Sequence, residues 1–417
     1  MRIAYFTDNY LPNTDGVVTS IKLVTEYLHK YGHEVYVFCP SGIEENKYTI
    51  PIPSKKYQKY PQYKVSFPSF EIITRLKEIN PDIIHVHTPV TIGLTGLYLG
   101  KILNIPTVIT YHTRLDSYMW YIRSKKDDHF IDIFTEWLYN QCPVIVPSKS
   151  IRQLLKEKRV ETPIDIIPNP VNLKLTNVKK EPNHKPILLH VGRICREKQI
   201  DLIIKAFEKI LRKQKAHLLI TSSGPDEERL KKIVKELNIY EKVTFTGYLT
   251  IDELHKSYLK SDILIAASNT ETQGLVVLEA MSSGCAVIAR NAPGFMDVIN
   301  EGVNGLLFDT EVELADKVIS LLKDDKKKSK LVNEGFNTVK KFYPDRLIPV
   351  LVRYYVHNLS QSREPPVERF LYTLSISFSF ILYMFVRDLD LPVNSRLTNI
   401  SVDVLKYLLM VAKFFRI

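Results

Sequence analysis

The sequence predicts an α/β protein of two domains, each built around a parallel β-sheet. A chain of 417 residues is long enough to fill two hydrophobic cores. Short apolar runs, of the length that buried parallel strands have, alternate with helical patterns in both halves. A polar, lysine-rich stretch bracketed by Pro170 and Pro186 separates the halves, and we interpret it as a linker.

The first half begins with a β-loop-α-β pattern, which implies a parallel sheet. Residues 2–6 form an apolar strand, a helix follows the loop and ends near Tyr31, and a second strand begins at Val35. Further strands are expected from Asp82, Thr107, Val144 and Asp165. The Gly-x-Gly-x-x-Gly fingerprint of dinucleotide-binding domains is absent, which disfavours a nicotinamide-dependent enzyme.

The second half repeats this alternation and so indicates a second α/β domain. Strands are expected at 186–191, 217–221, 243–245, 262–267 and 285–289, and helices at 201–213 and 227–237. The periodic signals stop near Leu322, and one more helix is expected at 347–359.

The stretch from 268 to 284 joins two of these strands through a polar loop and a short helix. Leu275, Leu278 and Met281 recur at helical spacing, and Gly284 stands where a helix C-cap belongs. Gly274 lies at the helix entry, where the missing Cβ lets a ligand approach the backbone. The N–H groups of the first turn and the positive end of the helix dipole suit a phosphate.

Two glutamates of this stretch lie in different surroundings. Glu271 is in the polar loop, whereas Glu279 is about one turn into the helix, on the side of Leu275 and Leu278. A carboxylate in an apolar setting needs a partner, so we expect Glu279 to have one. The alternative interpretation is a surface helix with two solvated glutamates.

Two cations follow the first strand of the second half. Gly192 permits a tight turn, and Arg193 and Lys198 then project at the carboxyl edge of the sheet, where open α/β sheets bind ligands. Arginine forks onto two phosphate oxygens and lysine adds a point charge. The pattern is suited to phosphate oxygens, and a solvated cationic cluster is the alternative.

Histidines end two strands of the first half. His112 can hydrogen-bond a substrate hydroxyl or bond within its own loop. His85 and His87 share one face of a strand, but without an evident third ligand, structural roles are favoured over metal binding. No Asp-x-Asp motif lies near a suitable strand end, so we expect no metal requirement and no cofactor.

These features resemble the retaining glycosyltransferases of family 4, which have two Rossmann-like domains. The family's acidic-pair motif is matched at Glu271, Gly274, Leu275, Leu278, Glu279, Ala280, Met281 and Gly284. Its diphosphate motif is matched at Gly192, Arg193, Glu197 and Lys198. Asp15 and Gly16 resemble the glycine loop of the first domain, although Val17 replaces the second glycine of many members; a plain turn is the alternative there.

The resemblance implies a GT-B fold, in which two parallel sheets face each other across a cleft. The expected parts are an acceptor domain at 1–170, a linker at 171–185, a nucleotide-sugar domain at 186–340, a helix at 341–360 that crosses back to the first domain, and a C-terminal extension at 361–417.

The resemblance also implies the reaction. A hexose would move from a nucleotide-sugar, a UDP-hexose, to an acceptor hydroxyl with retention. Glu279 would hold the ribose and Glu271 the sugar hydroxyls, with catalysis assigned to His112, Glu271, Arg193 and Lys198. Backbone N–H groups of Gly274, Leu275 and Val276 would hold the distal phosphate.

The acceptor is less constrained. The first-domain pattern and the Tyr-His-Thr at His112 look most like the branch that glycosylates diacylglycerol and related lipids. A lipid-linked saccharide or a polysaccharide precursor is the alternative within the class. A non-catalytic, membrane-associated protein that binds sugar nucleotides is the alternative from another class.

A net charge of +11 fits an anionic substrate or membrane surface, and nothing in the sequence supports nucleic-acid binding. Residues 370–386 are uncharged, and 402–417 are amphipathic with cations. Three interpretations of 370–417 stay open: spanning a membrane, lying in its interface, or packing on the protein. Four scattered cysteines and the lack of a signal peptide indicate a reducing compartment, so we expect the cytoplasmic face of a membrane.

Overall fold

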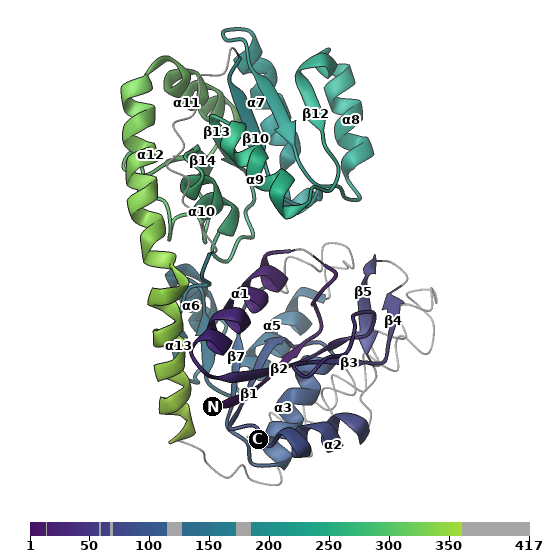
Figure 1. Cartoon of the computed structure of the whole chain (residues 1–417). Helices are drawn as coiled ribbons and strands as arrows, with labels where there is room; N and C mark the ends of the chain where they lie inside the picture. The colour runs from purple at the N-terminus through teal and green to yellow at the C-terminus, as the bar shows by residue number, and fades with distance from the viewer. Residues whose placement is uncertain (14, 58–59, 67–69, 115–126, 172–184, 361–417) are drawn as a thin grey trace.

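The computed structural model describes residues 1–13, 15–57, 60–66, 70–114, 127–171 and 185–360. Two parallel sheets, each flanked by helices, form the cores of two domains, and two consecutive helices, α12 (Asp325–Val339) and α13 (Pro344–Leu359), pass from the second domain to the first (Figure 1). The predicted α/β class is confirmed. Most of the expected linker, residues 172–184, and the whole C-terminal extension, 361–417, lie outside the described residues.

The first sheet has seven strands in the order β3-β2-β1-β6-β7-β8-β9, and every pair is parallel. The strands are β1 (Arg2–Thr7), β2 (Glu34–Pro40), β3 (Thr49–Ile52), β6 (Ile83–Thr88), β7 (Thr107–Thr110), β8 (Val144–Val146) and β9 (Ile164–Ile166). Strands β1 and β6 are buried on both faces, which explains their unbroken apolar runs.

Helices cover both faces of this sheet, and a hairpin adjoins it. The helices are α1 (Gly16–Lys30), α2 (Phe70–Ile79), α3 (Ile92–Ile102), α5 (Asp127–Tyr139) and α6 (Lys149–Glu157). The antiparallel hairpin pairs β4 (Ser54–Tyr57) with β5 (Tyr60–Ser66) and was not predicted, because its polar strands carry little apolar alternation.

The second sheet has six parallel strands in the order β12-β11-β10-β13-β14-β15. They are β10 (Ile187–His190), β11 (His217–Ile220), β12 (Val243–Phe245), β13 (Ile263–Ala266), β14 (Ala286–Arg290) and β15 (Leu306–Phe308). The helices are α7 (Ile200–Leu211), α8 (Glu227–Glu236), α9 (Ile251–Lys260), α10 (Leu275–Ser282), α11 (Glu311–Lys323), α12 (Asp325–Val339) and α13 (Pro344–Leu359).

Helix α12 corrects the expectation that periodic signals stop near Leu322. It runs for 15 residues and buries Leu331, Gly335 and Val339. These positions are four residues apart and form one narrow stripe, while most of the other residues are polar or charged. A stripe this narrow gives little periodic signal, and the Asp324 side chain, which accepts from the N–H of Lys327, starts the helix.

Helix α13 returns the chain to the first domain. Ile348, Leu351 and Tyr355 join the apolar core between α1 and the first sheet. The backbone N–H of Val171 donates to the carbonyl of Phe342 at 3.1 Å, so the chain segments on the two sides of the domain boundary touch there. The two domains are therefore joined through adjacent segments of chain (Figure 1).

Two further expectations concern the cysteines and the possibility of membrane-spanning helices. All four cysteines are free and buried, as predicted. In the described ranges, no helix has both the length and the apolarity that a bilayer crossing requires. The segments 370–386 and 402–417 belong to the part of the chain that the structure does not describe.

Candidate active site

The site lies at the switch points of the two sheets. In each sheet the strand order reverses beside the first strand: β1 lies between β2 and β6, and β10 between β11 and β13. Loops leave such a point in opposite directions and open a crevice at the carboxyl ends of the strands. Gly16 follows β1, Arg193 and Lys198 follow β10, and Glu271 follows β13, so the topology gathers the predicted groups.

Two ion pairs connect the cations to nearby acids. Lys198 Nζ lies 2.5 Å from Glu271 Oε1, and Arg193 Nη2 lies 2.9 Å from Glu197 Oε1. The Lys198 and Glu271 side chains are 25% and 19% exposed. Each cation is thus paired with a carboxylate, and a phosphate oxygen would have to compete with that carboxylate for the cation.

Burial and pairing act on these charges in opposite directions. Burial works to lower the pKa of Lys198, but attraction to Glu271 outweighs it, and the pKa lies above its usual value. Burial works to raise the pKa of Glu197, but hydrogen bonds and Arg193 bring it below its usual value. Lys198 is therefore charged at neutral pH, and Glu197 is ionised beside Arg193.

The entry of α10 is built around Gly274. This residue has φ of +72°, in the left-handed region, and a Cβ there would lie 2.6 Å from Phe295 Cδ1. The glycine lets the chain turn sharply into the helix, and it stands at the helix entry where the sequence placed it. The first N–H groups of a helix have no partner within it, so those of Leu275 and Val276 remain for a ligand.

Glu279 has the partner that its apolar setting requires. The hydroxyl of Tyr258, on α9, donates to Glu279 Oε2 at 2.7 Å. Burial raises the pKa of Glu279, and the bond from Tyr258 partly opposes that rise. Tyr258 was not among the predicted site residues, because no sequence pattern links two helices separated by a strand.

The first-domain loop meets the second domain at α10. The Asp15 carboxylate accepts from the N–H groups of Val17 and Val18 and so caps α1. A Cβ on Gly16 would lie 3.2 Å from Leu275 Cδ1. Asp15 and Val17 therefore start the helix, while Gly16 allows the close approach of α10.

His112 also lies where the domains meet. Its carbonyl accepts from Thr272 Oγ1 at 3.1 Å, next to Glu271. Its Nε2 lies 2.9 Å from His87 Nδ1. Burial lowers the pKa of His112 to about 4, so the ring is neutral at physiological pH.

His85 has the structural role that the sequence favoured. Its Nδ1 lies 2.6 Å from the hydroxyl of Tyr355 on α13, and its Nε2 lies 2.6 Å from Thr110 Oγ1. His87, by contrast, touches a predicted site residue. A shared strand face two residues apart placed these histidines together, but the partner of each depends on tertiary packing.

Sequence reasoning missed an amide lock between the domains. Gln273 Oε1 accepts from the backbone N–H of Asn169 at 2.7 Å and from its Nδ2 at 3.0 Å. Gln273 Nε2 donates to the Asn169 carbonyl at 3.0 Å, and Ser20 Oγ donates to Asn169 Oδ1 at 2.9 Å. This lock holds the loop of Glu271 against the end of the first domain.

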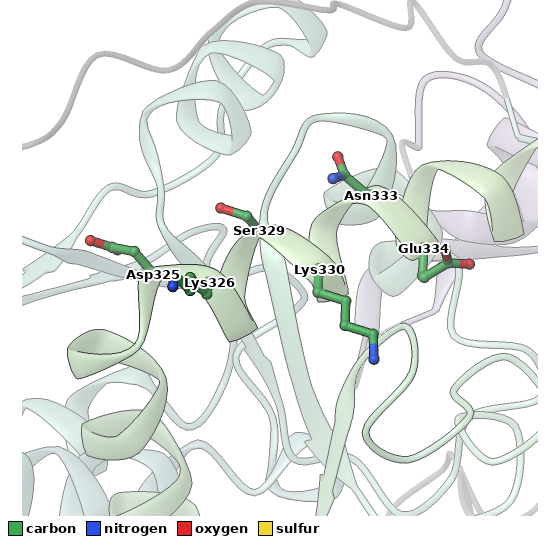
Figure 2. A pocket seen from close by; sticks show the side chains of 6 residues that line it. All are labelled: Asp325, Lys326, Ser329, Lys330, Asn333 and Glu334. Atoms are coloured by element: carbon green, nitrogen blue, oxygen red, sulfur yellow. The ribbon is translucent and has the colours of Figure 1, made fainter.

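Other surfaces contribute nothing to the site. Within the described ranges, no cluster of three or more His, Cys, Asp or Glu side chains is arranged to hold a metal ion. A hollow on α12, shown in Figure 2, is lined by Asp325, Lys326, Ser329, Lys330, Asn333 and Glu334. All six lie on one helix and none is a predicted site residue, so we assign this hollow no function.

Comparison with protein families now identifies the kind of enzyme. Residues 14–175 match the Glycosyltransferase Family 4 model, and residues 173–338 match the model of Glycosyl transferases group 1. An alpha-monoglucosyldiacylglycerol synthase from Streptococcus pneumoniae is 32% identical over 77% of this chain and 78% of its own. The chain belongs to the family 4 and group 1 glycosyltransferases. The enzyme of the same name from Acholeplasma laidlawii is 28% identical, over 77% of this glycosyltransferase and 88% of its own chain.

Solved structures confirm the GT-B fold of this glycosyltransferase. Sucrose-phosphate synthase from Thermosynechococcus elongatus has a TM-score of 0.71 at 22% identity, covering 87% of this chain and 100% of its own. Anabaena Alr3699/HepE, solved with UDP and glucose, has a TM-score of 0.66 at 15% identity, covering 86% and 100%. At these identities the likeness speaks for the fold alone.

Proposed function

We propose that this glycosyltransferase moves a hexose from a UDP-sugar to a hydroxyl group of a membrane lipid such as diacylglycerol, with retention of the anomeric configuration. The observation that carries the proposal is the convergence of Arg193, Lys198 and the N-terminus of α10 at one switch point, with Glu271 beside them. Two cations and a helix N-terminus are what a departing nucleoside diphosphate requires.

The groups of the site act on charge that develops during the reaction. The bond from the anomeric carbon to the phosphate oxygen breaks, the acceptor oxygen bonds to that carbon, and the acceptor's proton leaves with the phosphate. Negative charge grows on the distal phosphate, so Arg193, Lys198 and the N–H groups of Leu275 and Val276 stabilise the transition state more than the ground state. Because these groups neutralise the phosphates, the reaction needs no divalent metal.

The two glutamates serve different parts of the donor. Glu279, buried in α10 and held by Tyr258, is suited to accept hydrogen bonds from the ribose. Glu271 lies in the loop that touches the backbone of His112, and is suited to the sugar hydroxyls. The sugar then lies between the domains, where water is displaced by their contact.

The lipid acceptor and the UDP donor are supported by similarity. The two alpha-monoglucosyldiacylglycerol synthases match over most of their length, and a structure with the same fold was solved with UDP and glucose. We propose that residues 370–417 contact the membrane in which such a lipid lies, at its cytoplasmic face.

The test uses the full-length chain with labelled UDP-glucose, UDP-galactose or GDP-mannose and diacylglycerol in mixed micelles. We expect UDP release together with label in the lipid extract, an α-configured product by proton NMR, and unchanged turnover in EDTA. Arg193→Ala should reduce turnover by roughly a hundredfold or more. UDP binding without turnover on any donor would instead indicate a non-catalytic protein, and product found only in a saccharide fraction would exclude the lipid acceptor.

A further inference from the structure

His87 is a buried histidine to which the reaction proposed above gives no task. It lies on β6, 4% exposed, and its ring stacks on that of His112 with centroids 5.2 Å apart and planes 21° apart. The 2.9 Å separation of His87 Nδ1 and His112 Nε2 is that of a hydrogen bond. One of the two neutral rings must therefore donate an N–H hydrogen bond, and the other must accept it.

The other nitrogen of His87 shows which ring donates. His87 Nε2 is buried and has no hydrogen-bond partner among the described residues. If His112 were the donor, the proton of His87 would lie on Nε2, as a buried N–H without an acceptor, which is rare in proteins. If His87 donates from Nδ1, its Nε2 carries only a lone pair. The second arrangement leaves His112 Nε2 as the acceptor and places the His112 proton on Nδ1.

We propose that His87 is a positioning residue that holds His112 as the neutral tautomer protonated on Nδ1, so that His112 donates a hydrogen bond to an oxygen of the bound substrate. This inference rests on the proposed function and deepens it. It makes His112 a hydrogen-bond donor rather than a general base, because its basic nitrogen is occupied by His87. The ligand atom opposite His112 is then an oxygen with a free lone pair, such as a sugar or acceptor hydroxyl.

The surroundings keep both rings neutral. The titratable groups that face His87 are His85, His112 and Tyr5, whose rings lie 4.0, 5.2 and 4.4 Å away between centroids. Tyr355 on α13 closes the cluster through His85 and through the Tyr5 hydroxyl at 3.0 Å. No carboxylate is among these groups. Burial lowers the pKa of His87 and of His112, and His85 and His112 lower that of His87 further.

Two substitutions separate the hydrogen bond from the ring. In His87→Asn the amide nitrogen occupies the position of Nδ1 and can still donate to His112, whereas His87→Phe keeps the stacked ring and removes both nitrogens. We expect the Phe variant to lose roughly tenfold to a hundredfold in kcat, by analogy with the loss when the hydrogen-bond partners of metal-ligating histidines are removed. The Asn variant should stay within about fivefold of the parent, and KM for the donor should change little in both.

Affinity for UDP alone is the control, since its contacts are proposed for the second domain. Equal losses of kcat in the two variants, with normal UDP affinity, or no loss in the Phe variant, would overturn the inference. If the Phe variant does not fold, ¹⁵N-histidine NMR of the unliganded parent decides, with His112 assigned by substitution. One neutral tautomer with a protonated Nδ1 is expected at pH 7. A charged ring, a tautomer mixture or a protonated Nε2 would refute His87 as donor, whatever reaction the enzyme performs.

Discussion

Replacement of Glu271 by glutamine should separate donor binding from transfer. Glu271 Oε1 lies 2.5 Å from Lys198 Nζ, so the carboxylate competes with any phosphate for the ammonium group. Glutamine has nearly the same shape but no charge. Glu271→Gln should therefore tighten the binding of UDP, which lacks the sugar, and slow the transfer of the sugar whose hydroxyls Glu271 is proposed to hold.

The size of the effect follows from the geometry of the pair. Two unit charges a few ångströms apart attract by roughly 4 kcal/mol at an effective dielectric constant of about 20. The 25% and 19% exposure of the two side chains admits solvent, which screens the pair, so we take a net coupling of about 1–2 kcal/mol. Released to the diphosphate, this corresponds to roughly fivefold to thirtyfold tighter UDP binding. Turnover should fall by about tenfold or more.

Calorimetry with UDP, beside a turnover assay, measures both effects. The matched control is Glu313→Gln, which breaks another lysine pair, Lys317 with Glu313 at 2.9 Å, on a helix that contributes nothing to the site. It should change neither UDP affinity nor turnover. Unchanged or weaker UDP binding in folded Glu271→Gln protein would show that the pair does not restrain Lys198, and the reasoning would be wrong.

Three further predictions concern the frame of the site. Calorimetry should show that Tyr258→Phe weakens UDP binding by roughly tenfold at pH 6 and by less at pH 8. Burial raises the pKa of Glu279, and loss of the hydrogen bond from Tyr258 raises it further, so more of the carboxylate is protonated at the lower pH. A loss of affinity that does not depend on pH would contradict this. Gly274→Ala should lower the free energy of unfolding by about 2–4 kcal/mol, from the left-handed backbone and the contact with Phe295, and Phe295→Leu should recover part of it in denaturant titrations. Burial lowers the pKa of His190, which is 2% exposed, to about 4. As the pH falls, the unfolded chain therefore binds a proton at His190 before the folded chain does. Stability should fall by about 2 kcal/mol for this group between pH 7 and pH 5, and His190→Leu should lose that share of the pH dependence.

The sequence predicted elements better than it predicted partners. Buried strands such as β1 and β13 read as short apolar runs because both faces are covered, and Gly274 and Gly284 marked the ends of α10. Helix α12 was missed because it packs on its domain through one narrow stripe of small and apolar residues. So few buried positions give the sequence little hydrophobic periodicity.

Pairings across the fold had no local signal. Glu279 required a partner, but Tyr258 comes from a helix 21 residues earlier in the sequence, and its place depends on how that helix packs. Lys198 and Glu271 lie 73 residues apart and meet because β10 and β13 are neighbours in the sheet. Gln273 and Asn169 belong to different domains, and their lock depends on how the domains contact each other.

Helix α13 determines on which domain the described part of the chain ends. Its last turns pack on the first sheet through Tyr355 and Leu359, so the described chain ends at residue 360 on the first domain, although the preceding helix, α12, belongs to the second. In the proposed function, membrane contact through residues 370–417 would therefore anchor the first domain, which is proposed to receive the lipid.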